Sequence, residues 1–226
     1  MNDALVVVKA VGKAYPLADG QVTNVLSDID CAIEPGARIA LIGPSGSGKS
    51  TLLHIIGGFI PQSEGQVSWP AFGARADLLP EKVQAVFQAP SLFPALNVRD
   101  NIALPLLLAG RDAAAGFTPD DLLARFDLSE LALKLPEELS GGQAQRIAML
   151  RALSVSPRLI LADEPTGQLD SKTAQDFLTL VIDVADRLGA ALVIATHDPA
   201  VAARMDRQWS IDHGRLFADT NKGTAP

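Results

Sequence analysis

The chain has 226 residues, of which 48% are hydrophobic and 20% are charged, and its formal net charge is −7. This length suits one large domain or two modest ones, and the apolar content supports a sizeable core and excludes a disordered chain. The longest uncharged stretch, Val83–Val98, contains Pro90 and Pro94 and falls short of the ~20 apolar residues needed to cross a bilayer. We therefore expect no membrane-spanning segment.

Charge, cysteine content and the N-terminus exclude further classes. The acidic balance argues against a long nucleic-acid footprint, because neutralising phosphates requires clustered Lys and Arg, which are spread thinly here. Cys31 is the one cysteine, so an internal disulfide is impossible, and we expect a small buried apolar residue there. The N-terminus lacks a basic segment followed by an apolar run, which predicts a cytoplasmic chain without a secretory signal.

Strands dominate the first part of the chain. Ala4–Lys9 is β-branched and apolar, and Ser27–Ile33 alternates in polarity before a turn at Glu34–Gly36. Arg38–Ile42 is a short apolar strand that runs directly into the glycine-rich segment Gly43–Thr51. The apolar residues after this segment predict a helix that ends at the next pair of glycines. The order is therefore strand, glycine-rich loop, helix.

The middle of the chain is mostly helical. Asn97 is placed to cap the N-terminus of a helix that Pro105 should kink and Gly110 should end. Asp112–Gly116 is rich in small residues and predicts a loop, and Thr118 with the following proline begins another helix.

Alternating strands and helices return afterwards. Arg158–Ala162 and Ala191–Thr196 are near-continuous apolar strands, and Ser171–Leu188 between them is an amphipathic helix. Strands that are apolar on both faces predict a mostly parallel sheet. Ser210–Phe217 predicts a hairpin, and Ala218–Pro226 a polar, mobile tail.

The glycine-rich segment has the spacing of a phosphate-binding loop. Four residues separate Gly43 from Gly48, which Lys49 and Ser50 follow. Glycines let consecutive backbone N–H groups curl around the phosphates of a nucleotide. Lys49 would then reach the outer phosphates, and the Ser50 hydroxyl would bind Mg²⁺.

Two later strands end in residues that suit the same chemistry. Asp163 and Glu164 follow one strand, so Asp163 could hold the Mg²⁺ shell through water and Glu164 could act as general base for an attacking water. An acidic pair can also merely cap the next turn. His197 follows the next strand and could contact the terminal phosphate, whereas we expect His54 to be a packed or solvated helix residue and His213 a surface turn residue.

Leu139–Gln143, with the sequence Leu-Ser-Gly-Gly-Gln, is the most informative stretch. Its two glycines at the start of a helix would expose backbone N–H groups and the positive end of the helix dipole, so the chain carries a second anion site. Here the sequence resembles the ATP-binding cassette ATPases, whose signature motif has this sequence. The resemblance extends from about residue 5 to residue 217, with every motif in the family's order.

The resemblance implies an α/β fold, a P-loop NTPase core with a mostly parallel sheet, an N-terminal antiparallel β part and an inserted α-helical subdomain. We expect a single domain over residues 1–226. Its nucleotide-binding core would comprise residues 1–89 and 157–217, and its helical signature subdomain residues 90–156.

The resemblance also implies that ATP and Mg²⁺ are bound, and it assigns roles to individual residues. Tyr15 stacks on adenine, Glu164 is the base, His197 is the switch histidine, and Asp170 lies in the loop after the base. The residues expected to bind phosphate are Gly43, Pro44, Ser45, Gly46, Ser47, Gly48, Lys49, Ser50 and Thr51, with Ser140, Gly141, Gly142 and Gln143 as the signature. The expected Mg²⁺ ligands are Ser50, Gln88 and Asp163.

Partners follow from the same resemblance. Two cassettes pair head to tail, so that each nucleotide lies between Gly43–Thr51 of one copy and Ser140–Gln143 of the other. A separate membrane permease docks near Gln88–Leu96, which places the chain on the inner face of the membrane. The length leaves no room for a permease or a second cassette, and no nucleic-acid partner is expected.

The sequence from Asp163 to Asp170, with Asn101–Leu106, is most similar to the branch containing lipoprotein-releasing, macrolide-exporting and cell-division ATPases. Gln168 stands where that branch usually has Asn, Phe59 and Ile60 replace a usual Leu-Asp, and Ser68–Lys82 is shorter than usual. These departures lie outside the phosphate, base and switch positions. From the similarity to this branch we expect an ATPase that drives export or membrane extraction.

Other functions stay open. A small-solute importer ATPase would share the catalytic residues, and the topology of the permease would distinguish it. A cassette protein acting on ribosomes or DNA would need tandem cassettes or a long coiled-coil insertion. A non-hydrolysing adaptor would be expected to lack Glu164 and His197, and both are present.

Overall fold

The computed structural model describes residues 4–18, 20–110 and 117–217. The chain forms two compact units, Met1–Leu78 with Val193–Pro226 and Leu79–Leu192, called unit 1 and unit 2 below. The predicted loop at Asp112–Gly116 and the predicted tail at Ala218–Pro226 lie outside the described residues. The division into core and signature subdomain stays a prediction.

Unit 1 contains an antiparallel sheet of β1 (Val6–Pro16), β2 (Val22–Ile33) and β4 (Glu64–Ser68), in the order β2-β1-β4. β1 and β2 are longer than the predicted strands, because pairing continues past a register shift between Val8 and Val11, where Ala10 has a φ of 47°. β4 was not predicted, since its polar residues lack a strand pattern and its strand conformation comes from pairing with β1.

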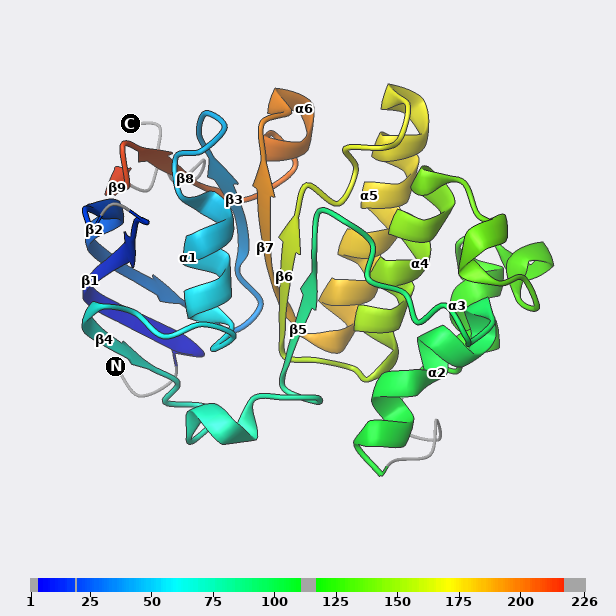
Figure 1. The fold of residues 1–226 in the computed structure, drawn as a ribbon. Coiled ribbons are helices and arrows are strands. Elements are labelled where there is room, and N and C mark those ends of the chain that lie inside the picture. The colour runs from blue at the N-terminus through cyan, green and yellow to red at the C-terminus, as the bar shows by residue number, and fades with distance from the viewer. Residues whose placement is uncertain (1–3, 19, 111–116, 218–226) are drawn as a thin grey trace, which may run out of the picture. The chain divides into compact units, whose positions relative to one another are not determined.

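A second group of strands in unit 1 positions the glycine-rich loop. β3 (Arg38–Ile42) pairs in parallel with β8 (Arg207–Asp212), which forms a hairpin with β9 (Arg215–Phe217). The hairpin turns at His213 and Gly214, as predicted, and β7 (Ala191–Thr196), which begins in unit 2, is the other neighbour of β3. α1 (Lys49–Ile56) follows the loop after β3, and a short α6 (Pro199–Ala202) follows β7 (Figure 1).

Unit 2 begins with a parallel strand pair. β5 (Val83–Val86) pairs with β6 (Leu159–Asp163), one residue later than the predicted strand, so Asp163 is its last residue. α5 matches the predicted Ser171–Leu188 and buries most of the expected apolar face, although Leu188 at its end is half-buried. Each fully buried Phe, Leu or Val on such a face contributes about 1.5–3 kcal/mol.

The middle of the chain, which the sequence predicted to be mostly helical, forms helices of unit 2. α2 (Val98–Leu108) is capped by Asn97 and contains Pro105, and α3 (Pro119–Arg125) is capped by Thr118. α4 (Gly141–Ser154) packs against α2 and α3 and lies beside α5 (Figure 1). Short 3₁₀ turns occur at Ser129–Leu131 and Pro136–Glu138 of unit 2, and at Arg75–Asp77 of unit 1. In the described part of the chain, every helix is too short or too polar to cross a membrane.

Cys31 differs from its predicted environment. The residue is half-buried on β2 and not fully buried as expected. Burial of its thiol and the neighbouring Asp30 carboxylate raise the pKa of Cys31 to about 12, although Arg207 acts in the opposite direction. The thiol is therefore a poor nucleophile at neutral pH.

Candidate functional site

The glycine-rich loop connects β3 to α1 and fixes the position of a buried lysine. The Lys49 Nζ donates hydrogen bonds to the carbonyls of Gly43 at 2.8 Å and Pro44 at 2.9 Å. Lys49 is only 9% exposed, so its ammonium group is held against the loop backbone. A fixed positive charge at this position suits an anionic ligand at the loop.

The loop backbone requires glycine at defined positions. Gly48 caps α1 with a φ of 106°, and a Cβ there would lie 2.7 Å from Leu26 Cδ2. Gly46 has a φ of 77° and has open space where a Cβ would stand. The Ser47 hydroxyl is buried and makes no hydrogen bond within the described chain. A helix N-terminus with an unsatisfied hydroxyl beside a lysine is a setting that phosphate fits.

His197 and Tyr15, two further predicted site residues, both lie in unit 1. His197 directly follows β7 and is exposed. The turn after it is ordered by hydrogen bonds from Asp198 N to Thr196 Oγ1 at 3.0 Å and from Ala200 N to Asp198 Oδ1 at 2.8 Å. Since β7 and β3 are neighbouring strands, His197 and the loop after β3 each follow one of two adjacent strands.

Tyr15 lies near the end of β1 and is 39% exposed. The Lys13 Nζ is 4.9 Å from the centroid of its ring. This exposed aromatic ring with a cation on one face has the surface that stacking on a base requires.

The acidic residues of unit 2 lie where two parallel strands end. Asp163 is the last residue of β6 and is 7% exposed, and Glu164 follows it. Val86 of β5 pairs with Ala162 of β6, so Gln88 and Glu164 both lie two residues beyond the last pair, at the same edge of the sheet. Parallel sheets bind ligands at this carboxyl edge.

Glu164 has an unusual backbone conformation. Its φ of 49° is in the left-handed region, which costs a non-glycine residue about 1–3 kcal/mol and persists only where surrounding contacts impose it. Gly167 N donates to the Glu164 carbonyl at 3.1 Å, and a buried side-chain amide from α4 donates to the same oxygen. Two hydrogen bonds to its carbonyl therefore hold the Glu164 backbone in this conformation.

The signature residues form the N-terminus of α4. The Ser140 hydroxyl accepts from Gln143 N at 3.2 Å, and the Gln143 side chain accepts from Ser140 N at 2.9 Å, which is a capping box. A Cβ on Gly142 would lie 2.7 Å from Leu169 Cδ2 and 2.9 Å from the Gln168 carbonyl, and one on Gly141 would overlap the Gln168 side chain. Gly142 is therefore required for close packing against the Gln168 backbone, whereas at Gly141 the flexible Gln168 side chain would have to move.

Asp170 is the N-cap of α5. Its carboxylate accepts from the N–H groups of Lys172 at 3.1 Å and Thr173 at 3.0 Å. These hydrogen bonds, above all those from Thr173, lower the pKa of Asp170. The carboxylate thus fixes the end of the loop that begins at Glu164.

The segment after Gln88 is held by two side chains that the sequence analysis did not identify. Arg151 of α4 donates to the Ser91 carbonyl at 2.6 Å and to the Ser91 hydroxyl at 3.1 Å. Asn101 of α2 is fully buried and bonds to the backbone of Phe93, Leu96 and Asn97. These contacts present the half-exposed Phe93 side chain at the surface.

A sequence signal for one of these residues existed. Asn101 occupies the i+3 position on the apolar face of α2, between Val98 and Ile102. A polar residue at a core position of an amphipathic helix is expected to have a specific hydrogen-bond partner.

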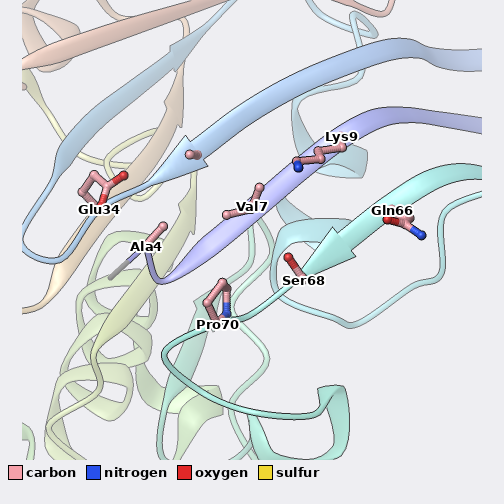
Figure 2. A pocket seen from close by; sticks show the side chains of 8 residues that line it. Ala4, Val7, Lys9, Glu34, Gln66, Ser68 and Pro70 are labelled. Carbon is pink, nitrogen blue, oxygen red and sulfur yellow. The ribbon is translucent and has the colours of Figure 1, made fainter. Parts of the chain in front are cut away.

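A groove of about 590 Å³ on the antiparallel sheet is separate from all predicted site residues (Figure 2). Val7 and Lys9 of β1 form its floor, since alternate strand residues point to the same face. Gln66 and Ser68 of β4 and Glu34 after β2 line its sides. Its lining gives no reason to assign it a part in nucleotide chemistry.

Comparison with known proteins agrees with these observations. Residues 26–167 match the family model described as ABC transporter. The lipoprotein-releasing system ATP-binding protein LolD of Shewanella oneidensis is 42% identical, covering 96% of this chain and 97% of that protein. LolD of Legionella pneumophila (strain Lens) is 40% identical, covering 96% of this chain and 99% of that protein.

A solved structure shows the same fold. The ATP-binding cassette MJ0796, as a dimer in a post-hydrolysis state bound to ADP and Pi, superposes with a TM-score of 0.87. It is 31% identical in sequence, and the match covers 97% of this chain and 100% of that one.

Proposed function

Since the chain belongs to the ABC transporter family, as an ATP-binding and ATP-hydrolysing subunit that works with a separate membrane permease, we propose that it powers lipoprotein release from a membrane. The observation that carries this proposal is the full-length identity of 42% and 40% with two lipoprotein-releasing system ATP-binding proteins. The sequence from Asp163 to Asp170 independently favours the same branch of the family.

We propose that ATP binds with its phosphates in the loop Gly43–Thr51. The buried Lys49 ammonium would contact the outer phosphates, and the unsatisfied Ser47 hydroxyl would gain a partner there. Tyr15 would stack on the adenine ring. The glycines of the loop support this assignment, because a Cβ at Gly48 would collide with neighbouring residues.

We propose Ser50, Gln88 and Asp163 as the residues that hold Mg²⁺. When bound, Mg²⁺ neutralises charge on the phosphates. Among the described residues, no three His, Cys, Asp or Glu side chains cluster in a way that could hold a metal. Mg²⁺ in nucleotide sites is usually held by one or two carboxylates together with phosphates and water, so a hydroxyl, an amide oxygen and a carboxylate suit it.

Glu164 would accept a proton from the attacking water or orient it, and His197 would contact the terminal phosphate. Asp163, which directly precedes Glu164, is nearly buried. This supports separate roles for the two carboxylates, with Asp163 binding the metal and Glu164 contacting the attacking water. Asp170 caps α5 at the end of the loop that begins at Glu164, and it would contribute to the nucleotide site by holding this loop.

Two copies of the chain would bind ATP between them. Ser140–Gln143 of one copy would contact the nucleotide held by Gly43–Thr51 of the other, where the positive end of α4 faces phosphate. The solved structure of MJ0796 is a dimer, which supports this arrangement. ATP would favour the closed pair and hydrolysis the open one, so the pair would act as a two-state switch.

The permease would dock on the segment Gln88–Leu96, with the chain on the inner face of the membrane. The exposed Phe93 ring, presented by Asn101 and Arg151, offers an apolar anchor for a partner helix. Because Gln88 begins this segment, movement at the nucleotide site would reach the permease directly.

Reconstitution tests the proposed substrate. The tagged chain is purified from membranes, its bound membrane protein is identified, and the complex is placed in proteoliposomes with a labelled triacylated lipoprotein. A soluble acceptor protein with an apolar cavity is added, because the acyl chains would otherwise return to the bilayer. We expect ATP-dependent transfer of the lipoprotein to this acceptor, and none with Glu164→Gln. ATP hydrolysis without lipoprotein release, together with ATP-driven uptake of a small solute, would contradict the proposal.

A second experiment tests the paired site. Glu164→Gln should bind ATP but hydrolyse it slowly, and should therefore accumulate as a nucleotide-bound dimer in light scattering after gel filtration. Wild-type protein with ADP is the control and should stay monomeric. A variant that remains monomeric with saturating ATP would show that the composite site is wrong.

A further inference from the structure

A glutamine on the signature helix connects that helix to the proposed catalytic base. Gln145 lies on α4, five residues after the cap Ser140, and is 1% exposed. Its Nε2 donates to the Glu164 carbonyl at 2.6 Å, and its Oε1 accepts from the Gln168 N–H at 3.2 Å. One side chain thus binds the loop from Glu164 to Asp170 at two points, its first residue and Gln168.

Contacts within the loop also shape it: Leu169 N donates to the Thr166 carbonyl at 3.0 Å, and Thr166 is 6% exposed. Glu164 is in the left-handed region with a φ of 49°, and a hydrogen bond from Gly167 N to its carbonyl closes the local turn. The local bond constrains residues 164–167 relative to each other. The bond from Gln145 is different, because it fixes the Glu164 peptide relative to α4.

The signature glycines pack against the same loop. A Cβ on Gly142 would meet the Gln168 carbonyl at 2.9 Å, and Gly141 lies against the Gln168 side chain. α4 therefore contacts the loop in two places, through its glycines at the N-terminus and through Gln145 about one turn later. A displacement of the signature end of α4 is expected to move the Glu164 peptide with it.

We propose that Gln145 is a positioning residue for ATP hydrolysis, which orients Glu164 by holding its backbone carbonyl and couples that orientation to the signature helix. The proposal rests on the base role proposed for Glu164. The competing interpretation is that Gln145 is only a buried polar residue that contributes to stability. If Gln145 positions Glu164, removing the amide lowers kcat. If it only stabilises the fold, removing the amide lowers the unfolding temperature and leaves kcat near wild type.

The test is Gln145→Leu in the full-length chain, because leucine fills a similar volume and makes neither hydrogen bond. We expect kcat for ATP to fall roughly ten- to a hundred-fold, the range that a misplacement of about 1 Å produces. KM for ATP should change by less than about twofold, since the phosphate-binding loop is untouched. If the leucine variant does not fold, Gln145→Met replaces it.

Ser154→Ala is the matched control. Ser154 lies on the same helix, is equally buried, and its Oγ bonds to the carbonyls of Ile102 at 2.8 Å and Arg151 at 2.9 Å. We expect this variant to lose thermal stability to a similar degree while kcat stays near wild type. Equal losses of kcat in both variants, an unchanged kcat in Gln145→Leu, or a change confined to KM would overturn the proposal.

A double variant separates this inference from the role of Glu164. Gln145→Leu combined with Glu164→Gln should still form the ATP-bound dimer, because Gln145 orients the base and takes no part in nucleotide binding. Loss of that dimer in the double variant alone would assign Gln145 to assembly and overturn the proposal. Full activity of Glu164→Gln by itself would instead refute the base assignment.

Discussion

Replacing Asn101 by leucine should loosen the segment that we propose as the permease contact. The Asn101 Nδ2 donates to the carbonyls of Leu96 at 2.8 Å, Phe93 at 3.1 Å and Asn97 at 3.1 Å, and its Oδ1 accepts from Phe93 N at 2.8 Å. Leucine keeps the volume and removes all four hydrogen bonds. The backbone of the segment then loses the side chain that fixes its path.

The loss in free energy of unfolding depends on which backbone groups are left without a hydrogen-bond partner. The carbonyls of Phe93 and Asn97 also accept from the N–H groups of Leu96 and Asn101, so the cost concentrates on the Phe93 N–H and the Leu96 carbonyl. An unsatisfied buried group costs about 1–3 kcal/mol, and the half-exposed Phe93 favours the lower end, so we expect about 3 kcal/mol in total. At about 2–4 °C per kcal/mol for a chain of this size, Tm should fall by ~6–12 °C.

Thermal and urea unfolding of the full-length variant provide the measurement. Asn97→Ala is the control, because Asn97 caps the same helix through Asp100 N at 2.8 Å, and its loss should cost only about 1 kcal/mol. Limited proteolysis should also cleave Asn101→Leu faster than wild type near residues 91–97. If Asn101→Leu unfolds no earlier than Asn97→Ala, the buried amide does not stabilise this segment.

Three further outcomes are expected. Lys49→Ala should weaken ATP binding by about 10- to 100-fold, as loss of a charge-assisted contact predicts, and calorimetry showing undiminished binding would mean the phosphate loop is misassigned. Gly142→Ala should destabilise the chain by about 1–3 kcal/mol and lower turnover, because a Cβ would meet the Gln168 carbonyl at 2.9 Å, and a wild-type Tm would contradict this packing. The Cys31 thiol, with a pKa of about 12 against an ordinary 9.0, should react with a thiol reagent at pH 8 roughly 10³-fold more slowly than in urea, and its rate should rise with pH. Equal rates in the folded and unfolded states would show that the thiol of this half-buried residue is not desolvated.

Elements with a strong local signal were predicted closely. β3, α5 and β7 have the predicted bounds, because each is a continuous apolar or amphipathic run between turn or capping residues. β4 and β5 were missed, since a short polar strand and a four-residue strand acquire their conformation from a partner strand. The cap residues Asn97 and Thr118 were predicted correctly, because capping depends only on residues within the first turn.

The residues of the candidate site also differ in whether the local sequence could predict them. Lys49 could be named from the spacing of the glycine-rich loop and Glu164 from its place after a buried strand, because phosphate binding demands particular residue types in a fixed local order. Ser140 was named from the resemblance of Leu139–Gln143 to the family's signature motif. Gln145 and Arg151 could not be named, because their partners at Glu164 and Ser91 lie 19 and 60 residues away in the chain. Nothing in the local sequence specifies such a pairing.

The sequence by itself determined the class of chemistry, the family and the residues of each motif, since these depend on local order along the chain. The tertiary structure decided how the motif residues are held. It placed Glu164 in a left-handed conformation under an amide from α4, and packed the signature glycines on the loop that follows the base. Hydrogen bonds and steric contacts between distant segments exist only once the chain has folded, so the link from Gln145 to Glu164 appears only in the three-dimensional structure.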